Sequence, residues 1–196
     1  GLIYSQKRYN YVEMDLENVS QNKISIIQAI EKNIPESLNI VSGNALRCDD
    51  YAKCDEYFEK DKPVAVINEG LLRYLTFDEK RIVAENIYSF LKEHDGVWIT
   101  CDVTPKKFVQ TQEKALPKFN TNLNKITSRN NLNDRFENIE HIKDFLGKIG
   151  FEVIEIHKFS EMTKDLYSVK HYGIINTDIE QSLEAAIVAV MKVKDE

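Results

Sequence analysis

Apolar residues along the chain gather in six short runs, and the segments between these runs place apolar residues at helical spacing. The runs predict strands at residues 9–15, 38–41, 64–67, 97–100, 151–156 and 185–191. No polar residue interrupts residues 64–67, a pattern typical of a strand buried on both faces of a parallel sheet. Because strands alternate with helices, the pattern predicts an α/β fold with a mostly parallel sheet and helices on both faces.

The clearest helix follows the third predicted strand. Thr76 and Glu79 have the spacing of a capping box, and Val83, Ile87 and Leu91 recur on one face of the helix that the box begins. The last predicted strand, in contrast, follows only a short helical segment. So short a connection favours a closing strand that runs antiparallel to its neighbours.

Residues 105–137 break this alternation, because they hold few apolar residues, many asparagines, and the helix breakers Pro105 and Pro117. Between residues 105 and 130 six basic residues accompany one acid, Glu113, in a chain whose net charge is −6. We interpret this insertion either as a solvated connection or as a lid that attracts an anionic substrate. Its basic residues are Lys106, Lys107, Lys114, Lys118, Lys125 and Arg129.

Composition limits the broad class. A chain of 196 residues with 42% hydrophobic and 30% charged residues is enough for one globular domain. It has no apolar run of membrane-spanning length and no signal-peptide pattern, so we expect a cytoplasmic protein without a membrane partner. The acidic net charge argues against nucleic acid as a partner.

Cysteine and histidine usage does not indicate a metal site. The three cysteines form no Cys-x-x-Cys pair, so neither a disulfide framework nor a zinc site is expected. Buried free thiols also fit a reducing cytoplasm. The four histidines lack the spacing of metal ligands.

Two acids mark the end of the first predicted strand. Asp15 ends that strand, where a carboxylate can accept hydrogen bonds from both hydroxyls of a ribose. A second interpretation is that Asp15 complements the dipole of the helix that follows. Glu13 shares a strand face with Asp15 and is the second candidate for the ribose.

Another acid follows the strand at residues 64–67, which stops abruptly at Asn68-Glu69-Gly70. The carboxyl end of a parallel strand borders the crevice in which open α/β sheets bind ligands. A buried Glu69 without a partner would be costly, so we expect a cation or several donors to face it. A structural salt bridge to Arg73 is the alternative.

Five short motifs occur in order along the chain. Residues 11–16 read Tyr-Val-Glu-Met-Asp-Leu, 43–46 Gly-Asn-Ala-Leu, 69–75 Glu-Gly-Leu-Leu-Arg-Tyr-Leu, 96–102 Gly-Val-Trp-Ile-Thr-Cys-Asp and 150–153 Gly-Phe-Glu-Val. Together they resemble the leucine carboxyl methyltransferase family over nearly the whole chain. The resemblance implies a Rossmann-like, class I S-adenosylmethionine-dependent methyltransferase fold, with a seven-stranded sheet whose last strand is antiparallel.

The function implied by this resemblance is O-methylation of a carboxylate or hydroxyl group on a small molecule, with S-adenosylmethionine as the cofactor. The family's first strand and its Gly-rich cofactor loop have no counterpart here. We therefore expect residues 1–196 to be a single but N-terminally incomplete methyltransferase domain, either preceded by a further segment or truncated. An anionic acceptor would suit the basic insertion at residues 105–137.

Two other functions remain open at this point. One is a non-catalytic, Rossmann-like remnant that acts as an interaction module. The other is a nicotinamide-dependent oxidoreductase, because Asp15 alone suits either cofactor. The motifs around Glu69 and Trp98 disfavour the oxidoreductase.

The resemblance also implies roles for residues near the cofactor. Asp15, with Glu13 as its alternative, would bind the ribose, while Asn44 and Ala45 would lie beside the adenine. Asn44 replaces the family's usual aspartate, and it can equally be a turn residue after Gly43. Glu69 and Gly70 would lie near the methionine end of the cofactor, where Glu69 would hold the ammonium group.

Four residues are candidates for the acceptor side of the site. Arg73 could clamp a carboxylate, Tyr74 could line the pocket, and Asp102 could touch the substrate or cap a turn. His171, between Tyr167 and Tyr172, is the one histidine that we retain as a candidate. A carboxylate acceptor needs no general base, whereas a hydroxyl acceptor would require one, for which His171 and Asp102 are the candidates.

Overall fold

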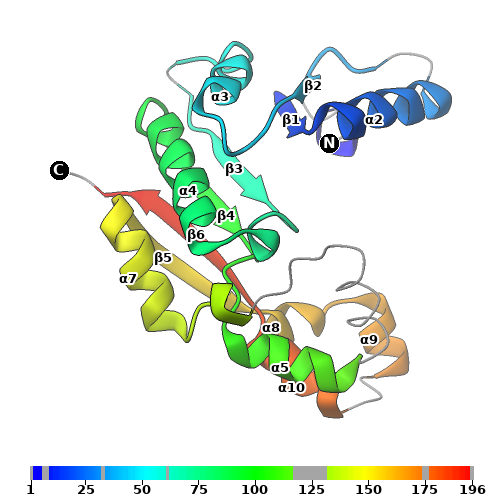
Figure 1. Cartoon of the computed structure of the whole chain (residues 1–196). Helices are drawn as coiled ribbons and strands as arrows, with labels where there is room; N and C mark the ends of the chain where they lie inside the picture. The colour runs from blue at the N-terminus through cyan, green and yellow to red at the C-terminus, as the bar shows by residue number, and fades with distance from the viewer. Residues whose placement is uncertain are drawn as a thin grey trace. The chain divides into compact units, whose positions relative to one another are not determined.

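The computed structural model describes residues 2–5, 9–31, 34–60, 62–116, 132–173 and 177–194 (Figure 1). Its six strands in these ranges match the six predicted runs. They are β1 (Tyr11–Asp15), β2 (Leu38–Ser42), β3 (Ala65–Asn68), β4 (Val97–Thr100), β5 (Phe151–Lys158) and β6 (Ile187–Val193).

Helices connect the strands, as the apolar periodicity predicts. The first are α1 (Leu2–Ser5), α2 (Glu17–Ile30), α3 (Cys48–Asp55), the 3₁₀ turn η1 (Leu72–Tyr74), and α4 (Phe77–Lys92). The later ones are α5 (Lys106–Ala115), the 3₁₀ turn η2 (Leu132–Asp134), α7 (Ile139–Ile149), α8 (Phe159–Thr163), α9 (Tyr167–Tyr172) and α10 (Thr177–Ala185). None of the helices in the described ranges is long and apolar enough to cross a membrane.

The strands of the described chain form two sheets. β1 and β2 pair in parallel, and the second sheet has the order β3-β4-β6-β5. Within it β3 and β4 are parallel, whereas β6 is antiparallel to both β4 and β5. β6 is therefore the one reversed strand of this sheet, which confirms the predicted mostly parallel α/β fold with an antiparallel last strand.

The prediction that residues 64–67 form a strand buried on both faces is wrong. β3 begins at Ala65 and lies at the edge of its sheet, where the side chain of Ile67 is 63% exposed. Val64, just before the strand, is the buried residue of the run. An unbroken apolar run predicts burial on both faces only for a strand with partners at both edges, and β3 pairs with β4 alone among the described strands.

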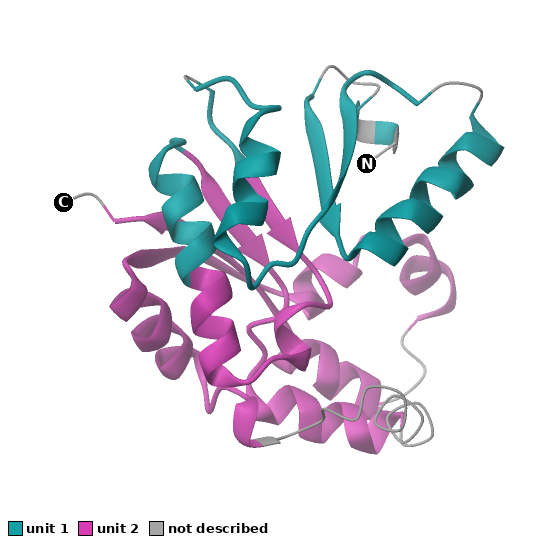
Figure 2. Ribbon diagram, turned by 45° about the horizontal axis from the view of Figure 1, so that its top comes forward, with its two compact units in different colours: residues 1–64, 85–95 teal, residues 65–84, 96–196 magenta. Residues whose placement is uncertain are grey.

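The chain divides into two compact units, shown in Figure 2. Unit 1 comprises residues 1–64 and 85–95, and unit 2 comprises residues 65–84 and 96–196. Helix α4 contributes residues to both. The single domain expected from the sequence stays a prediction.

Unit 1 is built around β1, β2 and the helices that pack on them. Tyr51 and Cys54 are buried on α3. His94 is 1% exposed, and its Nε2 lies 2.6 Å from Oδ1 of Asp55. This pairing gives the buried imidazole a partner, so His94 has a structural role.

The core of unit 2 gathers around β4 and β6. Trp98, Ala189 and Met191 are fully buried on these strands, and Ile142 and Leu146 are fully buried on α7. α7 begins after an asparagine cap, because Asn138 Oδ1 accepts a hydrogen bond of 2.9 Å from the N–H of His141. It ends at Gly150, whose φ of 115° is a conformation that favours glycine.

The insertion at residues 105–137 contains ordered structure at both ends. α5 packs against α10, Val109 is buried on it, and Phe136 is buried beyond η2. Lys106 forms an ion pair with Glu137, and Lys107 and Lys114 are exposed on α5. Pro117, Lys118, Lys125 and Arg129 lie outside the described residues, so the lid stays a prediction.

The capping box at the start of α4 is confirmed. The N–H of Thr76 donates to Oε2 of Glu79 at 2.9 Å, and the N–H of Glu79 donates to Oγ1 of Thr76 at 3.2 Å. The helix then buries Val83, Ile87 and Leu91, which are at most 2% exposed. Local capping and apolar spacing agree here, and this is why the sequence predicts α4 well.

Replacing Ile142 by alanine should lower the free energy of unfolding by about 2–4 kcal/mol, because it leaves a cavity in a core position. Ile142 is 0% exposed, whereas Ile154 on β5 is 46% exposed and provides a matched control. Ile154→Ala should cost less than about 1 kcal/mol. Urea unfolding of both variants measures the difference, and equal losses would contradict the described core of unit 2.

Candidate functional site

The carboxylate of Asp102 organises the loop that follows β3. Asp102 lies two residues after β4 and is 3% exposed. It accepts hydrogen bonds from the N–H groups of Gly70 (2.9 Å), Leu71 (2.7 Å) and Leu72 (3.0 Å), and from Nδ2 of Asn68 (2.8 Å). Four donors compensate the burial of one carboxylate, so Asp102 caps this loop.

This arrangement corrects the prediction for Glu69. The sequence indicates that donors or a cation should face a buried Glu69, but the side chain of Glu69 is exposed and the donors face Asp102. The chain turns at Gly70, whose φ is 72°, and the amides after it point to Asp102. The roles of Glu69 and Gly70 in cofactor binding stay predictions.

A further hydrogen bond ties the loop to the core. Nε1 of the buried Trp98 donates to Oδ1 of Asn68 at 2.7 Å, while Nδ2 of the same amide donates to Asp102. The N–H of Asp102 in turn donates to Oγ1 of Thr100 at 3.0 Å. The indole, the amide and the carboxylate therefore form one continuous network at the ends of β3 and β4.

Arg73 and Tyr74 lie in η1, the 3₁₀ turn that follows the loop capped by Asp102. Both side chains are half-buried. Arg73 and Glu69 are both among the described residues, and no ion pair joins them. The alternative interpretation, a structural salt bridge between the two, is therefore not observed. The roles of Arg73 and Tyr74 toward a substrate stay predictions.

Two cationic residues near Arg73 were not predicted from the sequence. Lys80 on α4 is 1% exposed, and its Nζ donates to the carbonyl oxygens of Leu75 and Asp134. Burial, with the positive charge of Arg135 as the next cause, lowers the pKa of Lys80 to about 8. Arg135 itself is 7% exposed.

A sequence signal for Lys80 exists. Lys80 precedes Val83 by three positions and Ile87 by seven, which places a charged residue on the apolar face of α4. Arg135 has no comparable signal, because it follows η2 in an irregular part of the chain. Its burial depends on tertiary packing alone.

In unit 1, Asp15 lies at the carboxyl end of β1 with an exposed side chain. Its Oδ1 accepts a hydrogen bond of 2.8 Å from the N–H of Leu16. Its carbonyl oxygen accepts one of 2.9 Å from the N–H of Gly43, which follows β2. The parallel pairing of β1 and β2 thus brings the Asp15 carboxylate close to the turn at residues 43–47.

Asn44 and Ala45 form part of that turn. Asn44 Oδ1 accepts a hydrogen bond of 3.0 Å from the N–H of Leu46, so the turn interpretation of Asn44 holds. The carbonyl oxygen of Ala45 accepts hydrogen bonds from the hydroxyl of Tyr51 (3.3 Å) and from Nδ2 of Asn86 (3.0 Å). Whether Asn44 and Ala45 also contact an adenine stays a prediction.

Asp50 holds the turn in place, and the sequence analysis did not identify it. Its Oδ2 accepts a hydrogen bond of 2.8 Å from the N–H of Asn44, and Lys53 Nζ lies 2.5 Å from its Oδ1. The hydrogen bond from Lys53, followed by that from Asn44, lowers the pKa of Asp50. A Cβ on Gly43 would lie 2.7 Å from Met14 Sδ and 3.0 Å from Asp50 Cβ, so the close approach requires glycine.

The remaining candidates have local partners. Glu13, the second candidate for the ribose, forms an ion pair with Lys23 of α2, and its role toward a ribose stays a prediction. His171 lies on α9, exposed, with its ring stacked on Tyr167 at a centroid distance of 3.8 Å. Its Nδ1 lies 3.0 Å from the carbonyl oxygen of Tyr167. The substrate role of His171 stays a prediction.

Neither a family model nor a curated protein matches the chain. Solved structures do match it. Geranyl diphosphate C-methyltransferase from Streptomyces coelicolor A3(2), solved with Mg²⁺, geranyl diphosphate and S-adenosyl-L-homocysteine, aligns with a TM-score of 0.55 and 11% identity, over 98% of this chain and 66% of that one.

Two further solved structures align with the chain at similar TM-scores and identities. An O-methyltransferase family protein from Burkholderia thailandensis aligns with a TM-score of 0.53 and 11% identity, over 94% of this chain and 43% of that one. PigF, solved with SAH, aligns with a TM-score of 0.50 and 13% identity, over 94% of this chain and 48% of that one.

The chain therefore spans less than two thirds of each of these structures. At identities of 11–13% the likeness concerns the fold alone. None of the three is described as a leucine carboxyl methyltransferase. The chain has the Rossmann-like α/β fold of these three structures.

Replacing Asp102 by asparagine should lower the free energy of unfolding by about 2–4 kcal/mol, because an amide presents an NH₂ group to N–H donors. Asp144→Asn is the matched control, since that carboxylate is 58% exposed and pairs with Lys148. Urea unfolding gives the loss, and amide exchange of residues 70–72 reports whether the loop loosens. A loss no larger than that of the control would contradict the capping role of Asp102.

Lys80 should make stability depend on pH. Its pKa in the folded protein, about 8, lies below its ordinary value of 10.5, so between these values the unfolded chain binds more protons. The free energy of unfolding of the wild type, relative to Lys80→Met, should therefore rise from about pH 8 to about pH 10.5. Urea unfolding across that range measures the difference, and a difference independent of pH would refute the lowered pKa.

Proposed function

We propose that the chain is part of an S-adenosylmethionine-dependent O-methyltransferase of the leucine carboxyl methyltransferase type. Its acceptor would be a small molecule with a carboxylate or hydroxyl group. The observation that carries the proposal is the exposed carboxylate of Asp15 at the carboxyl end of a parallel strand, beside the glycine turn that follows the neighbouring strand. Nucleotide-binding α/β folds use an acidic residue at this place to bind ribose hydroxyls.

Residues of unit 1 fit the nucleoside part of the cofactor. Asp15 would accept hydrogen bonds from the ribose, since its side chain is exposed and, among the described residues, its carboxylate accepts a hydrogen bond only from the backbone N–H of Leu16. Asn44 would donate from Nδ2 to an adenine ring nitrogen, because its Oδ1 already accepts from Leu46. Gly43 and Asp50 would keep the turn that carries Asn44 in shape.

The cofactor would supply a methyl group bound to a sulfonium. The surroundings of Asp102 in unit 2 are a reason to favour a carboxylate, rather than a hydroxyl group, as the methyl acceptor. A hydroxyl acceptor needs a general base, for which the sequence offers Asp102 and His171. Asp102 is 3% exposed and accepts hydrogen bonds from four donors, so it is unsuited to remove a proton. A carboxylate acceptor is already ionised near neutral pH and requires no base.

The solved structures support this proposal through their fold. Of the three matched proteins, one is an O-methyltransferase family protein and one is a C-methyltransferase, while PigF and the C-methyltransferase were solved with SAH and S-adenosyl-L-homocysteine. S-adenosylmethionine as the cofactor is consistent with that likeness. A cytoplasmic location and a small-molecule partner belong to the same proposal.

Asp15→Ala should weaken the binding of S-adenosylmethionine by about 1–3 kcal/mol, the cost of leaving hydroxyl partners unpaired. Calorimetric titration of the full-length protein measures the dissociation constant. Asp49→Ala is the matched control, because Asp49 is an exposed aspartate of unit 1 at the start of α3. An unchanged constant in Asp15→Ala would remove Asp15 from the site, and no binding by the wild type would favour a non-catalytic interaction module.

A further inference from the structure

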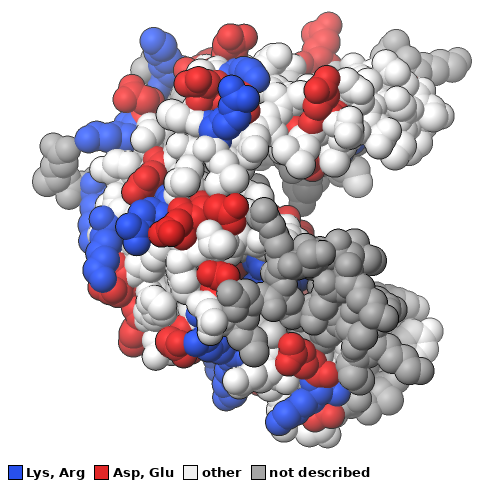
Figure 3. Space-filling model, viewed as in Figure 1, with Lys and Arg blue, Asp and Glu red and all other residues white. Residues whose placement is uncertain are grey.

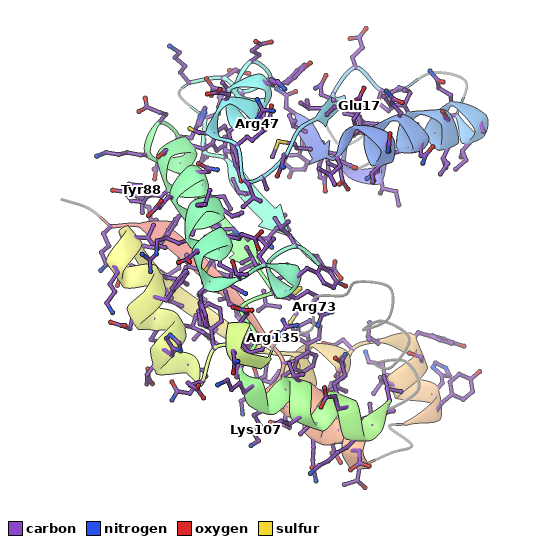
Figure 4. The ribbon with its side chains drawn as sticks, in the orientation of Figure 1. Glu17, Arg47, Arg73, Tyr88, Lys107 and Arg135 are labelled. Carbon is purple, nitrogen blue, oxygen red and sulfur yellow. The ribbon has the colours of Figure 1, made fainter. Side chains whose placement is uncertain are left out.

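Four of the five backbone N–H groups in the turn at residues 43–47 have an acceptor within unit 1. The exception is the N–H of Ala45, which has no acceptor among the described residues. The four pairs are Gly43 with the carbonyl oxygen of Asp15 (2.9 Å), Asn44 with Asp50 Oδ2 (2.8 Å), Leu46 with Asn44 Oδ1 (3.0 Å) and Arg47 with the carbonyl oxygen of Asn44 (2.8 Å). Ala45 is only half-buried, and an unpaired donor there is open to an acceptor from a ligand. In Figure 4 the labels of Arg47, at the end of the turn, and Glu17, at the start of α2, locate the two segments that follow β2 and β1.

Hydrogen bonds on both sides of Ala45 hold the orientation of this donor. The peptide group that contains its N–H is held by the bond from Arg47 to the carbonyl oxygen of Asn44. The next peptide group is held at the carbonyl oxygen of Ala45, which accepts from the hydroxyl of Tyr51 and from Nδ2 of Asn86. Burial raises the pKa of Tyr51, so its hydroxyl remains a donor at any ordinary pH. The donor is thus preorganised before a ligand arrives.

The side chain of Asn44 supplies a second donor. Only the oxygen of its amide can accept from the N–H of Leu46, so Oδ1 faces that N–H and Nδ2 is left for another partner. Nδ2 has no acceptor among the residues that the structure describes. Turning the amide over would place two donors face to face and leave the N–H of Leu46 unpaired. The turn therefore offers a ligand two donors, Ala45 N–H and Asn44 Nδ2.

We propose that these two donors bind ring nitrogens of the cofactor's adenine, and that the site does not recognise the 6-amino group of the base. The identity of the ligand as a cofactor with an adenine rests on the proposed function. The ring nitrogens of adenine accept hydrogen bonds, whereas its 6-amino group donates them. Neither donor of the turn can accept from an amino group, so neither favours adenine over a purine that lacks it.

Asn44 is the residue that sets this specificity. An aspartate at position 44 could accept from the N–H of Leu46 with one oxygen and from the 6-amino group with the other. The amide has one oxygen only, and that oxygen is used on Leu46. A site rejects an analogue strongly when it has a partner for the group that the analogue lacks, and Asn44 provides no such partner.

Charge does not replace the missing contact, because purine bases with and without the amino group are both uncharged. On the face shown in Figure 3, acidic and basic side chains of the described residues are interspersed. Selection between two uncharged bases depends on hydrogen bonds and shape rather than on a field of one sign. The pairing of Asn44 with Leu46 is therefore the feature that decides how the base is read.

The test compares two nucleosides that differ only in the amino group. Adenosine and purine riboside, which has hydrogen in place of the 6-amino group, are titrated into ¹⁵N-labelled full-length protein and followed by NMR. We expect both to shift the backbone signal of Ala45 and the side-chain amide signal of Asn44. Their dissociation constants should agree within about threefold, since no hydrogen bond distinguishes them. The side-chain amide of Gln28, exposed on α2, should not respond.

One substitution gives a second readout. Asn44→Asp keeps an acceptor for the N–H of Leu46 and adds one for the amino group, so it should favour adenosine over purine riboside by about tenfold. Asn22→Asp is the matched control, because Asn22 is exposed on α2, and it should leave the ratio unchanged. The comparison of the two nucleosides on the wild type does not depend on whether the variant folds.

Several outcomes would overturn the proposal. Adenosine that binds the wild type at least about tenfold more tightly than purine riboside would show that the amino group is recognised. Nucleosides that bind without shifting Ala45 and Asn44 would show that the turn does not contact the base. Nucleoside binding at the turn of a full-length protein that does not bind S-adenosylmethionine would refute the proposed function but leave the base site in place. Binding of S-adenosylmethionine together with selection for the amino group would overturn only this inference.

Discussion

The burial of one carboxylate, Asp102, is the constraint on which the structure of unit 2 around β3 and β4 depends. A carboxylate that is 3% exposed is tolerable only with several donors, and the chain provides them from the loop after β3. Those hydrogen bonds fix the path of residues 70–72, and they thereby place Leu72 in the core and Arg73 at the start of η1. The position of η1 therefore follows from where this loop is held.

Lys80 is a second buried charged residue of unit 2, and its charge is opposite to that of Asp102. Its ammonium group is buried and donates hydrogen bonds to the backbone carbonyl oxygens of Leu75 and Asp134. A buried amine costs free energy because burial disfavours its charged form, and its lowered pKa records that cost. This cost arises at position 80, where leucine or isoleucine would suit the apolar face of α4. Such an exception to local patterning is expected at functional sites.

The sequence predicts those parts of the fold that follow from local rules. The capping box and the spacing of Val83, Ile87 and Leu91 predict α4, and the short connection before β6 predicts its antiparallel direction, because both depend on residues close in sequence. The exposure of β3 at the edge of its sheet was not predictable in this way, since burial depends on which strands pair with it. The same holds for Arg135 and Asp50, whose partners come together only through tertiary packing.

The three acids that follow strand ends show why the candidate site could be predicted only in part. Asp15, Glu69 and Asp102 are equivalent in the sequence, since each ends or follows an apolar run. In the structure their surroundings differ: Asp102 is satisfied by four donors, whereas the side chains of Asp15 and Glu69 are exposed. A carboxylate whose acceptor sites are filled by the protein stabilises a loop, and one that is exposed can accept hydrogen bonds from a ligand. The backbone donors around each acid, which sequence alone does not reveal, therefore decide which carboxylate stabilises a loop and which can bind a ligand.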